Sequence, residues 1–400
     1  LGEVLHINQQ VMVLAYQYIK YIGVYDVFYN GKLEKDCSLA AIKKMNYIID
    51  TLNNIGYNVE VISIARNKKK AQKKSKIPLN NKLNSLILLN AIGSSNKFIS
   101  RIGELQIRLE LFLWLIKNIK KNETILVYHS QRLCKIIYWA SKIKKFNYIL
   151  EVEELYYKFG FVSKNEEKNE KKMIYNSKSL LVSTKNIANE LNYTNKFIEL
   201  HGNYENLSSE NRYVTKLDKK YKVVFAGGVE TVRNTAFNVC ECAKYLEECF
   251  DVYILGYGDE ESILKLEKLI MKINDKIGYS KIKYCGTMVG SEYDKFMSSC
   301  DIAINFQNMD EYYMKYAFPS KVLNYLGYNL IVITTPLETI RNSKINELVM
   351  YPNNMENTPE SFAYTINQLQ DTIQEKKQNI KYIIQSLDSE FKLKLYELLN

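Results

Sequence analysis

The apolar positions of the chain fall into short runs of strand length, separated by longer stretches with helical spacing. The first run spans 18–28, and residues 58–64 form the next one. Between them, from Ser38 to Gly56, apolar residues recur every three or four positions, at Leu39, Ile42, Met45, Ile48, Ile49 and Leu52. A strand, a helix and a strand joined by short connections predict a βαβ unit in a parallel sheet.

The same alternation continues along the chain and divides it in two. Further strands are predicted at 125–130, 148–156, 179–183 and 197–200, with helices at 96–120, 132–143 and 184–191. Residues 206–220 are polar, and a new apolar run begins abruptly at Tyr221. We therefore predict, in order, an N-terminal extension at 1–18, a first domain at 19–205, a linker at 206–220, a second domain at 221–375 and C-terminal helices at 376–400.

Glycines follow two of the strands predicted in the second domain. The run at 221–226 leads into Gly227-Gly228, and the run that ends at Leu255 leads into Gly256-x-Gly258. Backbone that lacks a Cβ can approach a pyrophosphate closely, so these turns favour phosphate binding. Arg233 follows the first glycine pair, and both a surface arginine and a bidentate phosphate contact are open for it.

A third loop joins a strand predicted at 302–306 to a helix that begins near Pro319. Pro319 sets φ where a helix can start, and Ser320 is a favourable cap. The free N–H groups of Ser320, Lys321 and Val322 would point out of the carboxyl edge of the sheet, where they can hold a phosphate. Because any helix can begin with Pro-Ser, the alternative is a helix start without a ligand.

In the first domain, His129 and several carboxylates lie at or just beyond the ends of predicted strands, where open α/β sheets bind ligands. Glu151 and Glu153 share one face of their strand, whereas Glu154 lies on the other. For His129, a hydrogen-bonded structural histidine and a functional one both stay open.

The charge of the chain favours anionic partners. Its formal net charge is +11 and 25% of its residues are charged. Residues 67–76, NKKKAQKKSK, hold a dense run of lysines that is typical of a solvated loop. A second interpretation is an anchor to anionic lipid head groups. Nucleic acid is the weaker option, because no aromatic residue interleaves the lysines for base stacking.

The spacing of the cysteines and the hydropathy of the chain indicate the cellular compartment in which it folds. The 7 cysteines are scattered without CxxC spacing, which predicts free thiols in a reducing cytoplasm. The 3 histidines lie far apart and form no ligand pair. No apolar run reaches the length of about 18 residues that a transmembrane helix needs, and the N-terminus lacks the pattern of a secretory signal.

Several of these segments resemble glycosyltransferase family 4, in particular a bacterial branch that reads roughly N-P-R, then S-F-P-S-K-x-x-E-Y-L, then a strand ending in T-T. The matching segments are SLAAIKKMNYIIDTLNNIGYNVEVIS, YHS, LEVEELY and the Phe-Pro-Ser-Lys at 318–321. They are spread over nearly the whole chain from about residue 19. Two positions depart from the branch: Asn324 stands where the family has a Glu that holds the ribose, and Gln307 stands in place of the Arg.

The resemblance implies an α/β fold with two Rossmann-like domains facing a cleft, the GT-B architecture, with C-terminal helices that cross back to the first domain. It implies a donor-binding set made of Gly227, Gly228, Arg233, Gly258, Gly286, Ser320, Lys321, Val322 and Asn324. It also implies Glu153, Glu154 and His129 as the groups that orient the sugar or the acceptor, and Gly31 on the acceptor side. No metal and no cofactor besides the nucleotide-sugar substrate is expected.

The function predicted on this basis is a retaining, hexosyltransferase-type glycosyltransferase. It would move a sugar from a nucleotide sugar to a glycan or lipid-linked saccharide in bacterial surface-polysaccharide or capsule biosynthesis. The alternative is a catalytically degenerate GT-B protein that scaffolds an active partner, which Asn324 and Gln307 favour. The expected location is the cytoplasm, with a peripheral position on the anionic inner face of the cell membrane as the open option, and no nucleic-acid partner is expected.

Overall fold

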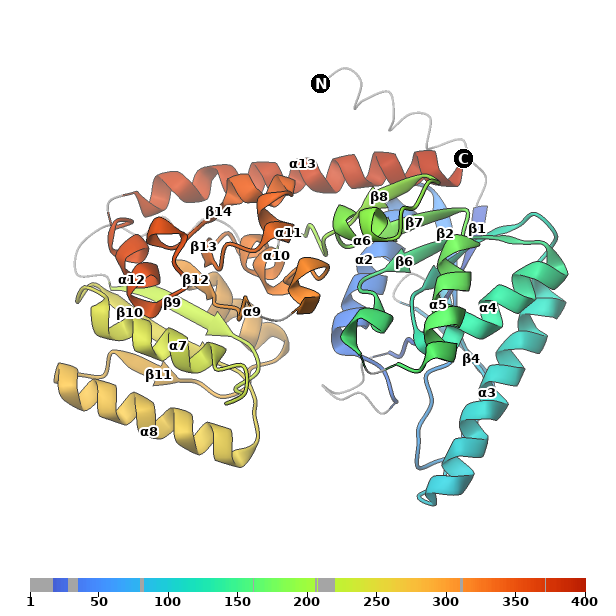
Figure 1. The fold of residues 1–400 in the computed structure, drawn as a ribbon, viewed down its shortest axis with the longest axis horizontal. Coiled ribbons are helices and arrows are strands. Elements are labelled where there is room, and N and C mark those ends of the chain that lie inside the picture. Colours follow the sequence, from blue (N-terminus) through green and yellow to red (C-terminus); the bar gives the residue numbers. More distant parts are fainter. Residues whose placement is uncertain are drawn as a thin grey trace. The chain divides into compact units, whose positions relative to one another are not determined.

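The computed structural model describes residues 17–27, 35–79, 83–160, 162–205, 207, 220–309, 312–370 and 372–400 (Figure 1). Gly31, most of the predicted extension at 1–18 and most of the predicted linker at 206–220 lie outside the described residues. Contacts divide the chain into two compact units, one comprising Leu1–Asn203 with Ser389–Asn400 and the other Tyr204–Asp388.

The first unit is built on a sheet with the strand order β3-β4-β2-β1-β5-β6-β7-β8. Its strands are β1 (Gln17–Gly23), β2 (Tyr57–Ser63), β3 (Ser75–Pro78), β4 (Ser85–Leu88), β5 (Thr124–Tyr128), β6 (Asn147–Val152), β7 (Ser179–Val182) and β8 (Phe197–Glu199). All neighbours pair in parallel except β3 and β4, which are antiparallel. The carboxyl ends of the parallel strands therefore meet along one edge.

The helices of the first unit form where apolar side chains recur at helical spacing. They are α2 (Leu39–Asn54), α3 (Lys97–Asn118), α4 (Gln131–Lys144), α5 (Lys164–Tyr175) and α6 (Lys185–Glu190), with a 3-10 turn η1 (Tyr156–Phe159). In α2 the buried face carries Ile42, Met45, Ile48 and Leu52. Gly56, at φ 95°, follows its end, a backbone conformation that glycine adopts without strain.

The second unit holds a parallel sheet in the order β11-β10-β9-β12-β13-β14. Its strands are β9 (Tyr221–Ala226), β10 (Phe250–Leu255), β11 (Ile282–Tyr284), β12 (Ile302–Asn305), β13 (Ile331–Thr334) and β14 (Val349–Met350). Its helices include α7 (Thr235–Cys242), α8 (Glu260–Ile277), α9 (Gly290–Ser298), α10 (Ser320–Gly327), α11 (Glu338–Arg341) and α12 (Pro359–Asn367), with 3-10 turns η2 (Ala243–Tyr245), η3 (Tyr312–Lys315), η4 (Lys344–Leu348) and η5 (Asn353–Met355).

In each sheet the chain moves outward in one direction and later returns to the middle to extend the sheet in the other. In the second unit the chain runs outward from β9 to β11 and then returns to place β12 beside β9. In the first unit, β5 returns beside β1 in the same way. At such a switch point the loops beyond the two neighbouring strands diverge and leave a crevice, which is where open α/β sheets bind ligands.

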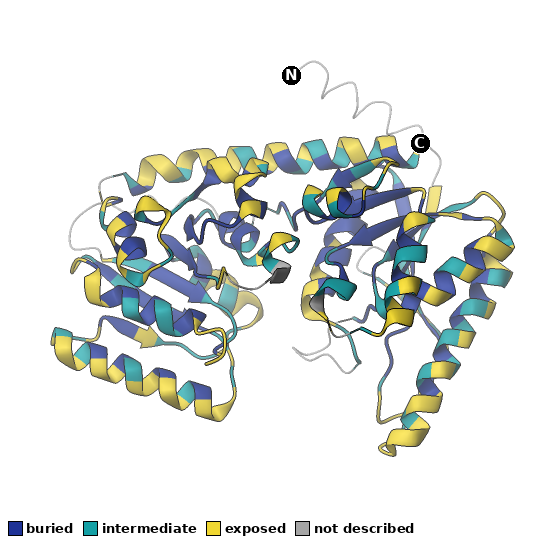
Figure 2. Ribbon diagram, in the orientation of Figure 1, coloured by how far each residue is buried: buried dark blue, intermediate teal, exposed yellow. Residues whose placement is uncertain are grey.

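The last helix, α13 (Ile373–Leu399), belongs to both units. Its final turns are counted with the first unit, where Phe391 stacks on Tyr47 with ring centroids 5.8 Å apart. The prediction of an α/β fold with two Rossmann-like sheets and a C-terminal helix that returns to the first unit is therefore confirmed. Figure 2 shows the strands of both sheets buried beneath their helices.

Several predicted elements differ in extent. The first strand ends at Gly23 and not at residue 28, and the strand predicted at 148–156 ends at Val152 and is followed by η1. The lysine run at 67–76 is not a loop throughout, because its last two residues begin β3. The short strands β3, β4 and β14 were not predicted. Strand β3 contains lysine and Pro78, and both residue types are depleted in strands, so its sequence does not indicate a strand.

Candidate functional site

The glycines beyond β9 and β10 pack backbone against backbone. The N–H of Gly227 donates to the carbonyl of Leu255 at 2.9 Å, and the N–H of Gly256 donates to the carbonyl of Gly286 at 2.9 Å. A Cβ on Gly256, whose φ is 151°, would lie 1.7 Å from the carbonyl oxygen of Gly227. The close backbone contact therefore requires glycine at position 256, and the loop beyond β9 lies at the switch point of the sheet.

Helix α10 begins beside these loops, with two differences from the prediction. Pro319, and not Ser320, occupies the capping position, and no side chain caps the helix. The N–H of Val322 donates to the carbonyl of Pro319 at 2.9 Å, so it is not available to a ligand as predicted. The N–H groups of Ser320 and Lys321 donate to no other described residue.

The side chain of Lys321 reaches from α10 into the glycine loop. A Cβ on Gly227 would lie 1.9 Å from its Nζ, so a larger residue there would displace the ammonium from its present position. The ammonium lies 4.8 Å from the ring centroid of Phe225, a cation–π contact. Burial, with a further contribution from the charge of Arg233, lowers the pKa of Lys321 to about 8. Among the described residues, no acceptor binds this ammonium.

Arg233 lies close enough to Lys321 for the two charges to interact. Its Nε is 3.5 Å from a carboxylate oxygen of Glu230, and both side chains are about half exposed. An exposed pair of this kind contributes little stability and can open. The structure therefore brings the two predicted cations, Lys321 and Arg233, to the same glycine loop.

The remaining predicted donor-side residues are Asn324, Gly258 and Gly286. Asn324 accepts a hydrogen bond on Oδ1 from the hydroxyl of Tyr293 at 2.9 Å, which leaves its amide N–H groups as donors. Gly258 pairs with Val229 in an isolated bridge, and Gly286 has φ 66° with open space around its missing Cβ.

Gln307, at the position where the branch has Arg, turns toward the sheet. Its side-chain amide donates to Asn305 Oδ1 at 2.9 Å, and its backbone N–H donates to Thr335 Oγ1 at 2.9 Å. A neutral side chain is therefore tied to the strand ends here, so it adds no charge to the loop.

The carboxyl edge of the first sheet carries a buried carboxyl pair. Glu151 is buried and accepts a hydrogen bond from the hydroxyl of Tyr21. Burial and the neighbouring charge of Glu153 raise the pKa of Glu151 to about 8. Glu153 forms an ion pair with Lys44, whose ammonium also donates to the carbonyl of Leu200 at 2.8 Å. The prediction that Glu151 and Glu153 share a face is confirmed.

His129, at the switch point of the first sheet, is buried beside a second carboxyl group. Its Nε2 lies 3.3 Å from Glu170 Oε1, and its ring packs on Tyr156 with centroids 4.8 Å apart. Burial lowers the pKa of His129 to about 3 and raises that of Glu170 to about 7, so the imidazole is neutral at pH 7. Both ring nitrogens of His129 are buried without a hydrogen-bond partner among the described residues, so the alternative of a hydrogen-bonded structural histidine is not supported and the catalytic role stays a prediction. Glu154 is half-buried, and burial raises its pKa.

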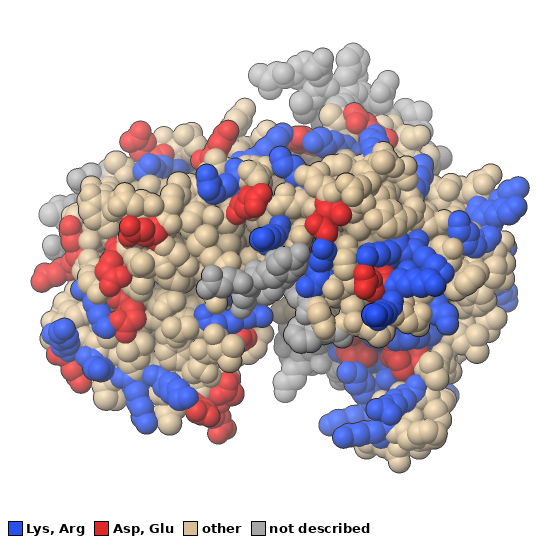
Figure 3. All heavy atoms as spheres, in the orientation of Figure 1, with Lys and Arg blue, Asp and Glu red and all other residues tan. Residues whose placement is uncertain are grey.

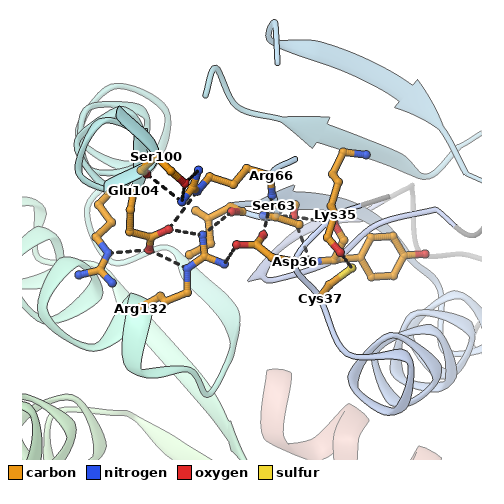
Figure 4. Close-up of polar contacts among 12 residues, drawn as sticks. Lys35, Asp36, Cys37, Ser63, Arg66, Ser100, Glu104 and Arg132 are labelled. Carbon is orange, nitrogen blue, oxygen red and sulfur yellow. Dashed lines mark hydrogen bonds and ion pairs between the residues drawn. The ribbon is translucent and has the colours of Figure 1, made fainter. Parts of the chain in front are cut away.

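A separate network of charges joins α3 and α4 to the end of β2 (Figure 4). Glu104 of α3 accepts from Arg66 Nε at 3.1 Å and from Arg132 Nε at 2.8 Å. Arg132 also pairs with Asp36 at 3.3 Å, and Arg108 pairs with Glu104 at 3.0 Å. Burial alone would raise the pKa of Glu104, but the hydrogen bond and charge of Arg132 outweigh it and lower that pKa.

Sequence reasoning missed Lys44 and Tyr21 as members of the first edge. A signal for Lys44 was present, because it falls at helical spacing from Ala41 and Ile48 on the buried face of α2. Tyr21 carries no such signal, since tyrosine is ordinary in a buried strand. Among the described residues, no group of three His, Cys, Asp or Glu side chains could share a metal ion, and no helix is long and apolar enough to cross a membrane.

Comparison with solved structures identifies the fold. The chain has the GT-B fold, an α/β architecture of Rossmann-like units found in glycosyltransferases. Similar structures include sucrose-phosphate synthase from Thermosynechococcus elongatus, with a TM-score of 0.66 and 12% identity over 95% of this chain and 98% of that one.

Two further structures resemble the chain to a similar degree. Anabaena Alr3699/HepE in complex with UDP has a TM-score of 0.62 and 10% identity, covering 95% of this chain and 100% of that chain. A glycosyltransferase from Rickettsia africae has a TM-score of 0.64 and 14% identity, covering 96% and 99%. No family model matches the sequence, and no curated protein is found as a relative.

Proposed function

We propose that the protein is a glycosyltransferase that binds a nucleotide sugar at the glycine loops of the second unit and transfers the sugar with retention. The single observation that carries the proposal is the ammonium of Lys321, which is largely buried against the glycine loop at the switch point of a GT-B sheet. It has no hydrogen-bond acceptor or ion-pair partner among the described residues, although the charge of Glu230 lies near enough to interact with it. Anabaena HepE, whose fold is similar, is described in complex with UDP.

The chemistry follows from the charges at this edge. The leaving diphosphate would gain stabilisation from the ammonium of Lys321, the guanidinium of Arg233 and the first N–H groups of α10. These groups supply the positive charge, so the proposed reaction includes no metal and no other cofactor. Gly227, Gly228, Gly258 and Gly286 would let the nucleotide approach the backbone.

Acceptor binding is assigned to the first unit. The proposed acceptor is a glycan or a lipid-linked saccharide of bacterial surface-polysaccharide or capsule biosynthesis, consistent with the sequence resemblance. Glu153 and Glu154 would orient its hydroxyl groups, with His129 as a neutral neighbour, and Gly31 stays an acceptor-side prediction. The proposed location is cytoplasmic and peripheral to the membrane.

The second candidate is a degenerate transferase that binds a partner enzyme. The observation that favours it is the neutral pair of Asn324 and Gln307, because the first is engaged by Tyr293 and the second by Asn305. An amide holds a ribose hydroxyl less strongly than a carboxylate does.

Calorimetric titration with UDP, GDP, ADP and CDP separates the two candidates. A transferase is expected to bind one of them, and Asn324→Glu to tighten that binding roughly tenfold, because a carboxylate accepts stronger hydrogen bonds. Gln385→Glu, on α13, serves as the control and should leave affinity unchanged. Absence of binding by both the native protein and Asn324→Glu would refute the transferase and leave the binding-subunit function.

A further inference from the structure

Helix α3 is fixed in orientation by its inner face. Leu111 is fully buried there, and Gly103 presses against the backbone of Ile92, whose oxygen a Cβ would meet at 2.0 Å. Glu104 adds the charge network of Figure 4, which ties the helix to α4 and to the end of β2. The helix therefore cannot rotate to bury its opposite side within the first unit.

That opposite side is apolar as well. Apolar side chains recur on it every three or four residues, and their exposed fractions are 71% for Phe98, 67% for Leu105, 58% for Leu109 and 56% for Leu113. Figure 2 shows exposed positions recurring along α3 between buried and intermediate ones. Large apolar side chains that share one exposed face mark a surface that is covered in use.

The strip continues onto α4 through an open groove of about 850 Å³. The apolar side chains that line this groove are Leu105, Leu109 and Phe112 from α3, with Ile136, Trp139 and Ile143 from α4. Trp139 is 47% exposed, and its partly exposed indole suits the boundary between water and an apolar phase. We call these residues, with Phe98 and Leu113, the apolar face.

Basic side chains border the apolar face on two sides. A groove of about 660 Å³ between α4 and α5 is lined by Lys142, Lys164, Lys168, Lys171 and Lys172, against the one carboxylate Glu167. At the start of α3, Lys68, Lys69, Lys97 and Arg101 line another groove of about 480 Å³. Figure 3 shows Lys and Arg side chains gathered over α5 and at the lower end of α3.

From this juxtaposition we infer that the apolar face docks onto the surface of an anionic lipid bilayer. Apolar side chains enter the head-group region, and the flanking lysines bind lipid phosphates. A nucleic acid would match the lysines but not the exposed leucines, and a protein partner would not need basic residues on both flanks. Lys68 and Lys69 belong to the lysine run at 67–76, for which a lipid anchor was one interpretation of the sequence. In the structure they lie at the start of α3, beside the apolar face. This inference does not rest on sugar transfer.

The test uses the full chain with vesicles of phosphatidylcholine, either pure or with about one third phosphatidylglycerol. The protein is expected to sediment with the anionic vesicles and to be released by salt. Trp139 is a built-in probe, because Trp114, the other of the 2 tryptophans, is buried. Its emission should shift to the blue on addition of anionic vesicles, and Trp139→Phe should remove that shift.

Two variants separate the apolar and electrostatic contributions. L105S/L109S and K164Q/K168Q/K172Q should each weaken vesicle binding by roughly tenfold or more. The matched control is L264S/M271S, which changes two exposed apolar residues of α8 in the second unit and should bind as the native protein does. Because all the replaced side chains are exposed or partly exposed, an unchanged melting temperature verifies folding for each variant.

Three results would overturn the inference. The first is equal binding of the native protein and L105S/L109S. The second is equal sedimentation with neutral and anionic vesicles. The third is a dimer, seen by light scattering without lipid and lost in L105S/L109S, which would make the apolar face an interface between two copies. Loss of nucleotide binding would not affect any of these readouts, so failure of the proposed function is distinguishable.

Discussion

The carboxyl edges of the two sheets each hold a buried or nearly buried lysine, and the two ammonium groups have opposite surroundings. Lys44 in the first unit is enclosed by the Glu153 carboxylate and the Leu200 carbonyl. Lys321 in the second unit faces the ring of Phe225 and the space that glycine leaves at Gly227, with no bound acceptor among the described residues.

The difference supports the proposal that the carboxyl edge of the second sheet binds an anion. A lysine whose hydrogen bonds are satisfied needs no ligand, and its removal leaves a carboxylate without its cation. A buried lysine without an acceptor disfavours the folded state until an anion arrives, and its lowered pKa expresses that cost. Comparing the same substitution at both positions measures this difference directly.

Replacing Lys44 with Met should have the largest effect on stability. The change leaves the Glu153 carboxylate beside the buried Glu151 without its cation, and we expect a loss of about 3 kcal/mol in the free energy of unfolding. Urea unfolding measures it. Lys272→Met on the exposed surface of α8 is the control, with an expected change of about 0.5 kcal/mol or less. Similar small losses in both proteins would show that the Lys44 pair is not structural.

Replacing Lys321 with Met should act in the other direction. Removal of an unpaired buried charge is expected to raise the free energy of unfolding by about 1 kcal/mol. The same variant should bind the preferred nucleoside diphosphate between about tenfold and a hundredfold more weakly. Unfolding and calorimetry on one preparation give both values. A destabilised variant with unchanged affinity would contradict the assignment of Lys321 to the phosphate site.

The pKa of Lys321 predicts how this affinity depends on pH. Because burial lowers that pKa to about 8, binding of a diphosphate above pH 8 requires uptake of a proton. We expect affinity to change little between about pH 7 and pH 8, where the diphosphate stays fully ionised, and to fall about tenfold for each pH unit above pH 8. Lys321→Arg should remove the dependence, since arginine stays charged. A native profile that stays flat to pH 9 would show that the ammonium does not contact the ligand.

Glu151→Gln should produce the smallest effect, and it tests the buried carboxyl pair at the carboxyl edge of the first sheet. With a pKa raised to about 8 by burial, the folded protein holds a proton that the unfolded chain releases near pH 4.5. Native stability therefore falls as pH rises across this window. The variant should melt a few degrees higher relative to the native protein at pH 8 than at pH 5. Glu261→Gln on α8 should show no such trend, and equal trends would place the titration elsewhere.

Periodicity of apolar residues was enough to predict the two Rossmann-like units, because their strands are buried on both faces and their helices expose one polar side. It could not predict β3, whose pairing with β4 outweighs the low strand propensity of its lysine and proline. For the same reason the ends of strands were uncertain: Val152 ends β6 where η1 begins, a tertiary choice that periodicity does not encode.

For the candidate site, the sequence indicates which residues lie at the carboxyl edges of the sheets but not which atoms contact one another. The glycine loops and Lys321 could be assigned because residue type alone restricts what they can do. The hydrogen bond from Val322 to Pro319 and the ion pair of Lys44 could not, since both depend on atoms from distant or irregular backbone. The sequence also gave no warning that His129 is enclosed, because burial at a strand end depends on η1 and α5 packing over it.

Strand β3 has a consequence for how the chain behaves at high concentration. Among the described residues it is the outermost strand of the first sheet, so one row of its backbone groups has no neighbouring described strand and could pair with another molecule. Lys73, Lys74 and Lys76 stand on or beside this edge, and Pro78 removes a donor from it. Two chains that approach edge to edge bring these charges together, which disfavours intermolecular sheet growth. Lys73 and Lys74 are thus expected to disfavour edge-to-edge association, whereas the charge of Lys76 is paired with Glu60.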